Sequence, residues 1–281
     1  MAEIGKTQSL EIVKHVDFGV YLDGDMEEEI LLPQRYLPEN EEDWEVGKLI
    51  DVFVYLDSED RPIATTETPL AEVGDCACLT VINRTKFGAF LDWGLSKDLL
   101  VPFKEQRVPM EPGRSYVVYL YLDNTGRIAA TSRLSRHLSE QNEDEFKVRQ
   151  KVDLLVATRS EMGYKVVING THLGLIHNDD VTRLLQIGDR LTGFVKEPRP
   201  DGRINITLQR PANELRHELA DQIMDYLQEN DGRCNLTDKS DPEAIRAIFR
   251  TSKSTFKKAL GKLYKDKKII LETDCIRLAG K

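Results

Sequence analysis

The sequence has no long apolar run, and nothing in its 281 residues approaches the roughly 20 consecutive apolar positions that a membrane-spanning helix needs. Its first residues, MAEIGKTQSLEIVKHVDFG, also lack the basic leader and the apolar stretch of a signal peptide. These absences argue against a membrane role, so we expect a protein that stays in the cytoplasm. The composition, 40% hydrophobic and 31% charged, is typical of folded soluble domains.

Cysteine is scarce as well. The four cysteines, Cys76, Cys78, Cys234 and Cys275, are too few and too scattered for a disulfide framework in a chain of this size. We therefore expect reduced, partly buried thiols. Cys76 and Cys78 would point to one face of a strand, but no nearby Cys or His completes a tetrahedral zinc set, so no metal site is predicted.

The motifs of the common enzyme classes are missing too. The sequence has no Walker loop, no GxGxxG, no HExxH, no nucleophile elbow and no carboxylates spaced for a metal. We therefore predict a protein that has no catalytic residues and needs no cofactor.

What the sequence does contain is an internal repeat. Residues 86–103 (KFGAFLDWGLSKDLLVPF) match residues 17–34 (DFGVYLDGDMEEEILLPQ) without a gap. Residues 121–132 (YLDNTGRIAATS) match residues 55–66 (YLDSEDRPIATT) in the same order. A third copy is fainter and keeps mainly its glycines. Similarity of this kind indicates repeated domains.

Each copy consists of five short runs of β-branched and aromatic residues, separated by Gly, Asp, Asn and Pro. In the second copy these runs are residues 79–83, 87–92, 98–101, 115–122 and 127–131. Five strands in about 70 residues predict a small closed barrel, which has no exposed sheet edge. The glycine after the first aromatic residue, Gly88 in the second copy, predicts a bulge in that strand.

After Pro211 the pattern changes to helices. Apolar residues recur at helical spacing at Leu215, Leu219, Ile223 and Leu227. Asp241-Pro242 begins a second helix that stops near Arg250, and Ser252 or Ser254 caps a third. Residues 267–280 predict two short strands about a turn, which completes a winged helix.

We therefore predict a mainly β chain with a C-terminal α+β domain. The predicted five-stranded OB-fold barrels span residues 1–69, 70–140 and 141–211, and the predicted winged helix spans residues 212–281.

Charge is distributed unevenly along this chain. The net charge is −9, yet twelve basic against five acidic residues from Lys239 onward leave about +7 there and about −16 before it. The third helix carries much of the positive charge, at Lys253, Lys257, Lys258, Lys262 and Lys265, with Lys267 and Lys268 entering the wing. Phe256, Leu260 and Leu263 would form its buried side. The lysines fit a track for phosphates, and they also fit a solvated helix face.

The repeats resemble the OB-fold RNA-binding domain first named from ribosomal protein S-one. The resemblance lies in KFGAFLD at 86–92, in LLVPF at 99–103 and in the hairpin from Asp123 to Arg127. That family contacts single-stranded RNA through aromatic side chains on adjacent strands, a histidine after the third strand, and the Asp and Arg of the last hairpin. By this resemblance the RNA-binding residues are Phe87, Phe90, Asp123 and Arg127 in the second copy, and Phe18, Tyr21, Asp57 and Arg61 in the first.

The third copy departs from this pattern. Met162 and Lys165 replace the aromatic pair, whereas His177 and Arg203 match the family. The first two copies lack the histidine and have Pro33 and Pro102 in its place. The resemblance therefore implies Lys165, His177 and Arg203 as the RNA-binding residues of the third copy.

These residues also have ordinary structural interpretations. Residues three apart on a strand face opposite sides, so one of Phe87 and Phe90 would lie in the core unless a bulge intervenes. Arg61 and Arg127 also fit plain hairpin charges, and His177 also fits a structural histidine.

The order of the parts, three such barrels and then a winged helix, resembles the conserved virulence factor B family of bacterial RNA-binding regulators. The resemblance covers nearly the whole chain. It implies that single-stranded RNA is the partner, with the ribosome or mRNA-associated proteins as further partners, and that the protein regulates gene expression after transcription, including virulence genes.

Two other functions stay open at this point. The first is a transcriptional regulator whose winged helix binds duplex DNA, although the third helix offers lysines rather than the Arg, Asn and Gln that read base edges. The second is a protein-docking role for the acidic barrels. The acidic runs at residues 27–29 and 39–43 make the first barrel the strongest candidate for that role.

Overall fold

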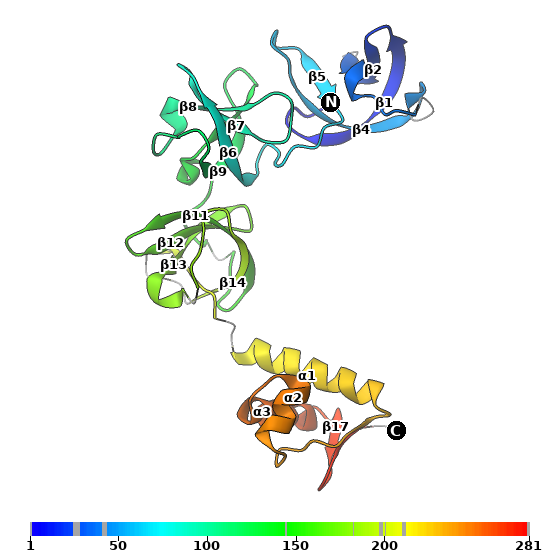
Figure 1. Ribbon diagram of the computed structural model, residues 1–281, viewed down its shortest axis with the longest axis vertical. Coiled ribbons are helices and arrows are strands. Elements are labelled where there is room, and N and C mark those ends of the chain that lie inside the picture. Colours follow the sequence, from blue (N-terminus) through cyan, green and yellow to red (C-terminus); the bar gives the residue numbers. More distant parts are fainter. Residues whose placement is uncertain are drawn as a thin grey trace. The chain divides into compact units, whose positions relative to one another are not determined.

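The computed structural model describes residues 2–24, 29–40, 44–143, 145–181, 183–196, 199, 201–209 and 212–279, with side chains from residue 219 onward in the last range. The predicted boundary at Pro211, the side chain of Leu215 and the acidic residues 27, 28 and 41–43 lie outside this part. The chain divides into two compact units, Met1–Leu208 and Gln209–Lys281 (Figure 1). No helix among the described residues is long and apolar enough to cross a membrane.

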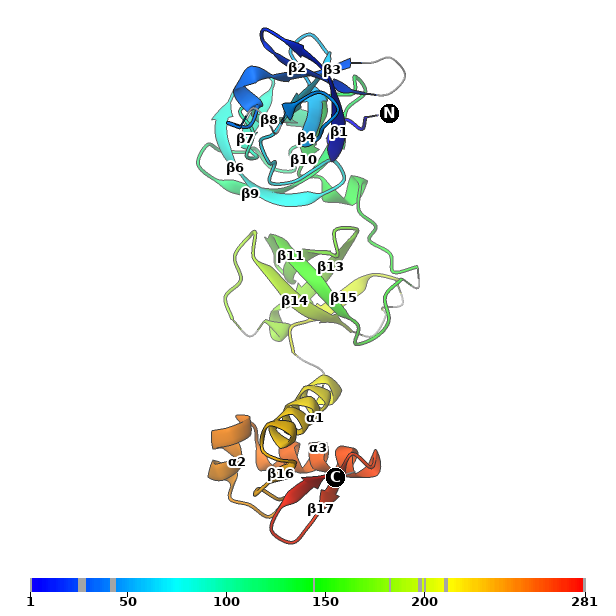
Figure 2. The same ribbon diagram turned by 90° about the vertical axis from the view of Figure 1, so that its right-hand side faces the viewer.

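The first unit contains three five-stranded barrels, as predicted (Figures 1 and 2). Their strands are β1 (Thr7–Val16), β2 (Gly19–Asp23), β3 (Glu29–Pro33), β4 (Leu49–Leu56) and β5 (Pro62–Thr65); β6 (Cys76–Arg84), β7 (Gly88–Asp92), β8 (Leu99–Pro102), β9 (Ser115–Leu122) and β10 (Ile128–Thr131); and β11 (Lys151–Ser160), β12 (Gly163–Ile168), β13 (His172–His177), β14 (Arg190–Val195) and β15 (Ile204–Thr207). The first and third barrels are closed, in the orders β1-β2-β3-β5-β4 and β11-β12-β13-β15-β14. The second is nearly closed, because its sheet of order β10-β9-β6-β7-β8 stays open between β8 and β10.

Strand alternation separates the core of each barrel from its surface. In β7, Ala89 and Leu91 are fully buried in the second barrel. Phe90 lies between them and is half-buried on the opposite face of the strand. The same pattern holds in β2, where Val20 and Leu22 are buried and Tyr21 is half-buried. The strand pattern therefore turns one aromatic residue away from the core in each of the first two barrels, whereas β12 has Lys165 at this position.

Each second strand begins at a glycine, and the backbone there leaves no space for a side chain. A Cβ at Gly19, Gly88 or Gly163 would lie 2.0–2.2 Å from a carbonyl oxygen of the neighbouring third strand. The bulge predicted at Gly88 is wrong in position, because the register shifts on the neighbouring strand, between Val81 and Asn83. The first and third barrels have the same shift on β1 and β11.

The first two barrels are joined through a buried aromatic contact. Phe53 of β4 is buried in the same apolar cluster as the core residues of the second barrel. Its ring meets Trp93 edge to face, with centroids 5.5 Å apart. Tyr36 and Ser96 add a hydrogen bond of 3.4 Å between the hydroxyls. The repeat pattern alone gave no sign of this shared core.

A second apolar cluster joins the second barrel to the third. Cys76 and Val117 are buried in it together with Leu155 and Leu173. Cys76 and Cys78 lie on this outer face of β6, as predicted for residues two apart, and Ala77 points into the barrel core. Burial raises the pKa of the Cys76 thiol to about 12. All four cysteines are free, which confirms the prediction of reduced and partly buried thiols.

The second unit has the predicted helices α1 (Ala212–Glu229), α2 (Pro242–Phe249) and α3 (Lys253–Lys265). Asp241 caps α2 by accepting from the backbone N–H of Glu243 at 2.9 Å. Ser252, rather than Ser254, caps α3 by accepting from the N–H of Thr255 at 3.2 Å. The sequence therefore specifies both helix starts through their capping residues.

A small sheet completes the winged helix. The predicted hairpin is β17 (Ile269–Leu271) and β18 (Ile276–Leu278). The two-residue strand β16 (Arg233–Cys234), which the sequence pattern did not reveal, adds to β18 and gives the order β16-β18-β17. The predicted buried side of α3 is confirmed: Phe256, Leu260 and Leu263 pack in one cluster with residues of α1, including Ile223 and Leu227.

Candidate nucleic-acid interface

The first barrel presents two aromatic rings at the start of β2. Phe18 precedes the strand and is 56% exposed. Tyr21 lies three residues further along, within β2, and is half-buried. The two rings meet edge to face with centroids 6.4 Å apart. The ammonium group of Lys14 lies 4.7 Å from the centroid of the Tyr21 ring. The barrel thus offers open ring surface beside a positive charge.

The hairpin between β4 and β5 adds a guanidinium to this surface. Arg61 binds Asp57 of the same hairpin through Nη2 at 2.8 Å and Nε at 3.0 Å. The backbone N–H of Arg61 also donates to Asp57, and these contacts hold the pKa of the Asp57 carboxyl below its usual value. Arg61 also pairs with Glu59 at 3.0 Å. The structure therefore holds the Arg61 guanidinium against the carboxylates of its own hairpin.

In the second barrel neither predicted aromatic residue lies in the core. Phe87 precedes β7, so strand alternation does not apply to it, and its ring is 62% exposed. The ammonium group of Lys86 lies 5.1 Å from the centroid of that ring. Phe90 is half-buried on the outer face of β7. The core interpretation of this pair is therefore wrong.

A third aromatic residue of the second barrel was not among the predicted site residues. Phe103 follows β8 and is 42% exposed, and the guanidinium of Arg84 lies 5.3 Å from its ring centroid. Gly88 pairs with Pro102 at the end of the β7–β8 ladder. Phe103 directly follows this pair and begins a short 3-10 helix, Phe103–Glu105. It is the last residue of LLVPF at 99–103, and that motif is the sequence signal that would have pointed to it.

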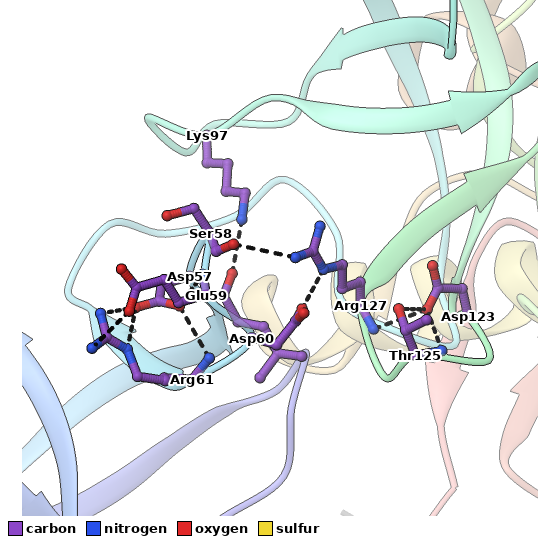
Figure 3. Close-up of polar contacts among 10 residues, drawn as sticks. Asp57, Ser58, Glu59, Asp60, Arg61, Lys97, Asp123, Thr125 and Arg127 are labelled. Atoms are coloured by element: carbon purple, nitrogen blue, oxygen red, sulfur yellow. Dashed lines mark hydrogen bonds and ion pairs between the residues drawn. The ribbon is translucent and has the colours of Figure 1, made fainter.

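Arg127 of the second barrel lies differently from its counterpart Arg61. Its backbone N–H donates to Asp123 at 3.1 Å, as the matching group does in the first barrel. Its guanidinium, however, pairs with Asp60 of the first barrel and approaches the carbonyl oxygen of Ser58 at 3.4 Å (Figure 3). The structure thus places Arg127 in a contact between the hairpins of two barrels.

Lys97 of the second barrel reaches the same hairpin of the first. Its ammonium group donates to the carbonyl oxygen of Leu56 at 2.8 Å. Partial burial, reinforced by the nearby Arg127, lowers the pKa of Lys97. The two barrels therefore meet through charged side chains as well as through Phe53 and Trp93.

In the third barrel Lys165 and Arg203 come together. Both lie 3.7 Å from the carboxylate of Glu140. With the exposed Met162 they line a small pocket of about 110 Å³. His177 pairs with Gly163 at the end of the β12–β13 ladder, the place that Pro33 and Pro102 occupy in the other barrels. His177 is not one of the described residues that line this pocket.

The lysines of α3 divide into two groups. Lys253 donates to the carbonyl oxygen of Lys239 at 3.1 Å, and Lys257 lies 3.4 Å from the carboxylate of Asp238. Lys258, Lys262 and Lys265 recur at spacings of four and three, so they lie on one side of the helix. That side is the one turned away from the buried Phe256 and Leu263.

Comparisons with known proteins identify the domain types. A family model described as a CvfB-like winged helix domain matches residues 221–278. A model described as an S1 domain matches residues 4–67 and 73–133, which are the first two barrels. Both are nucleic-acid-binding domain types, and neither is an enzyme family.

Similar proteins cover nearly the whole chain. Uncharacterized protein YitL of Bacillus subtilis is 30% identical over 281 residues, which cover 95% of this chain and 91% of that protein. Conserved virulence factor B of Staphylococcus epidermidis is 27% identical over 286 residues, with coverages of 99% and 95%. A crystal structure of a multidomain protein with nucleic acid binding domains from Streptococcus pneumoniae is 24% identical, covers 98% of each chain and gives a TM-score of 0.40.

Proposed function

We propose that this chain, which belongs to the conserved virulence factor B family, binds single-stranded RNA without catalysing a reaction and regulates gene expression after transcription in the cytoplasm. The observation that supports this most is the open aromatic surface of the first two barrels. Phe18 and Phe87 occupy equivalent positions, and both rings are more than half exposed. Lys86 lies beside the Phe87 ring, and Lys14 lies beside the Tyr21 ring that Phe18 contacts.

Open rings of this kind suit unpaired bases. A base in a duplex is already stacked on its neighbours, whereas a base in a single strand is free to stack on a phenylalanine. Such stacking contributes about 1–3 kcal/mol per base and tolerates any sequence. Lys86 beside the Phe87 ring supplies charge for the phosphates of the same strand, whereas Lys14 beside the Tyr21 ring is paired with Glu29 at 2.8 Å. The preference for RNA over DNA is supported by the match to the S1 domain model.

The winged helix would contribute further phosphate contacts. The outward side of α3 carries Lys258, Lys262 and Lys265, and the helix contains no Arg, Asn or Gln for bidentate reading of base edges. We therefore assign it to the RNA backbone rather than to a DNA operator. The ribosome and mRNA-associated proteins are the partners that such a regulator would meet.

A pair of variants tests the role of the rings. Phe18→Ala and Phe87→Ala are compared with the intact protein in titrations of a labelled single-stranded RNA. We expect each variant to weaken binding by roughly 5- to 100-fold, which corresponds to the loss of one stacked base. Leu49→Ala is the matched control, because Leu49 is 67% exposed on β4, which β1 separates from β2. Equal affinity in all four proteins would refute the proposal for these rings.

A further inference from the structure

A groove of about 550 Å³ lies between the second and third barrels. Residues of β9 and of the segment after β10 form one side, and residues of β11, β12 and β13 form the other. Its described lining contains five basic residues and no acidic one: Arg107, Arg133, Arg136, Arg159 and Lys165. The concentration of positive charge is notable because the residues before Lys239 are acidic overall.

Three of these cations keep their charge unpaired. Arg136 is neutralised by the buried carboxylate of Glu105, which it contacts at 2.9 and 3.0 Å, and Lys165 lies near Glu140. Within the described part of the chain, Arg107, Arg133 and Arg159 have no carboxylate partner. Unpaired cations that line a concave surface repel one another, and a bound anion removes that repulsion.

One of the unpaired arginines is also held in place. The Nε group of Arg133 donates to the carbonyl oxygen of Lys104 at 2.8 Å, which fixes the plane of the guanidinium. A guanidinium that is fixed in this way loses little conformational freedom when it binds a phosphate through its remaining N–H groups.

The groove continues into the candidate interface of the third barrel. Lys165 and Leu173 line both the groove and the pocket that contains Met162 and Arg203. The lining of the groove also includes the apolar Ile187, which is 46% exposed. A ligand in the groove therefore meets both basic and apolar side chains, which fits a chain of phosphates that carries bases.

We infer that the groove holds the phosphodiester backbone of a single RNA strand as it passes from the second barrel to the third. The inference rests on the proposed function, and it names a second contact surface distinct from the rings of Phe18 and Phe87. It gives the arginines a role that does not depend on stacking, so the two claims are tested by different variants.

The test is the salt dependence of RNA binding in the full-length chain. The double variant Arg107→Gln, Arg159→Gln removes two positive charges from the groove and keeps a polar side chain at each position. The matched control is Arg114→Gln, Arg183→Gln, which removes two exposed arginines of the same barrels that lie outside the groove lining. The ligand is a single-stranded RNA of about 30 nucleotides, long enough to span two barrels. A polyglutamate of equal charge serves as competitor.

We expect the groove variant to bind RNA at least about 10-fold more weakly at low salt. We also expect the plot of the logarithm of the binding constant against the logarithm of salt concentration to be shallower by about 1.4, because each lost phosphate contact lowers this slope for a single strand by about 0.7. The control is expected to keep the affinity and slope of the intact protein. If the groove variant matches the control while Phe87→Ala still weakens binding, the inference fails and the proposed function stands. If polyglutamate displaces the RNA at equal concentration, the groove binds acidic proteins and the inference fails. If the intact protein binds no RNA, both claims fail together.

Discussion

Arg127 of the second barrel forms an ion pair with Asp60 of the first, whereas its counterpart Arg61 pairs with Asp57 inside its own hairpin (Figure 3). The two hairpins share a turn in which one residue has a left-handed backbone. That residue is Asp60 in the first barrel, with φ of 63°, and Gly126 in the second, with φ of 79°. The first barrel thus provides a carboxylate where the second has none, and the carboxylate captures Arg127.

From the proposed function, we expect that replacing this carboxylate frees Arg127 to bind RNA. Asp60→Gly gives the first hairpin the residue that Gly126 provides in the second, so the turn geometry is expected to remain and the buried contact of Phe53 with Trp93 to keep the barrels together. We expect tighter RNA binding at low salt and a salt slope steeper by about 0.7, the contribution of one added phosphate contact. The matched control is Asp51→Asn, which removes an exposed charge from β4. Unchanged affinity and slope in Asp60→Gly would show that Arg127 does not reach the RNA.

The lowered pKa of Asp57 predicts how the stability of the fold changes in acid. Hydrogen bonds from the backbone N–H of Arg61 and from its guanidinium lower the pKa of Asp57 in the folded protein, so the ionised carboxylate stabilises the fold above the unfolded pKa of about 3.9. This stabilisation is lost as the pH falls through the folded pKa. We expect Asp57→Asn to be less stable than the intact protein at pH 7 and to lose less stability between about pH 4 and pH 2. Urea unfolding at several pH values measures this, and parallel curves would contradict it.

The close approach at the start of β7 predicts a large cost for a single methyl group. Gly88→Ala places a Cβ 2.2 Å from the carbonyl oxygen of Val101, so the β7–β8 ladder has to shift. We expect a loss of about 2 kcal/mol or more in the free energy of unfolding of the second barrel. Gly113→Ala is the control, because Gly113 has φ of 78° but no atom within 4 Å of the added methyl, and we expect a loss of about 1 kcal/mol. Fluorescence of the buried Trp93 in a Trp44→Phe background reports the unfolding. Equal losses in the two variants would contradict the steric argument.

From the proposed function, we expect Glu140 to compete with RNA for two cations of the third barrel. It lies 3.7 Å from both Lys165 and Arg203, at the junction of the groove and the smaller pocket. We expect Glu140→Gln to bind single-stranded RNA about two- to fivefold more tightly, since exposed pairs of this kind contribute only about 0.2–1 kcal/mol each. Glu143→Gln, an exposed glutamate of the same segment, is the matched control. Weaker binding by Glu140→Gln would show that the carboxylate positions the two cations instead of competing for them.

Much of the fold follows from local sequence patterns. The strands of the second barrel and the caps at Asp241 and Ser252 are specified by residues close in sequence, so alternation and turn chemistry predict them. The direction of Arg127 is different, since its own hairpin resembles that of Arg61 and only a contact with another barrel distinguishes them. The groove is likewise invisible in the sequence, because Arg107 and Arg159 belong to separate repeats. The four-domain boundaries and the RNA-binding roles of the predicted residues stay predictions.

The central claim is that the chain binds single-stranded RNA, and one competition measurement tests it most directly. Labelled single-stranded RNA is bound to the intact protein and displaced by unlabelled single-stranded RNA, single-stranded DNA of the same sequence, or duplex DNA of equal length, at two salt concentrations. We predict that RNA displaces the label best and duplex DNA worst, and that the order holds at both salt concentrations, because stacking on Phe18 and Phe87 is less sensitive to salt than phosphate contacts. Displacement by duplex DNA alone would contradict the account and assign the nucleic-acid contact to the winged helix.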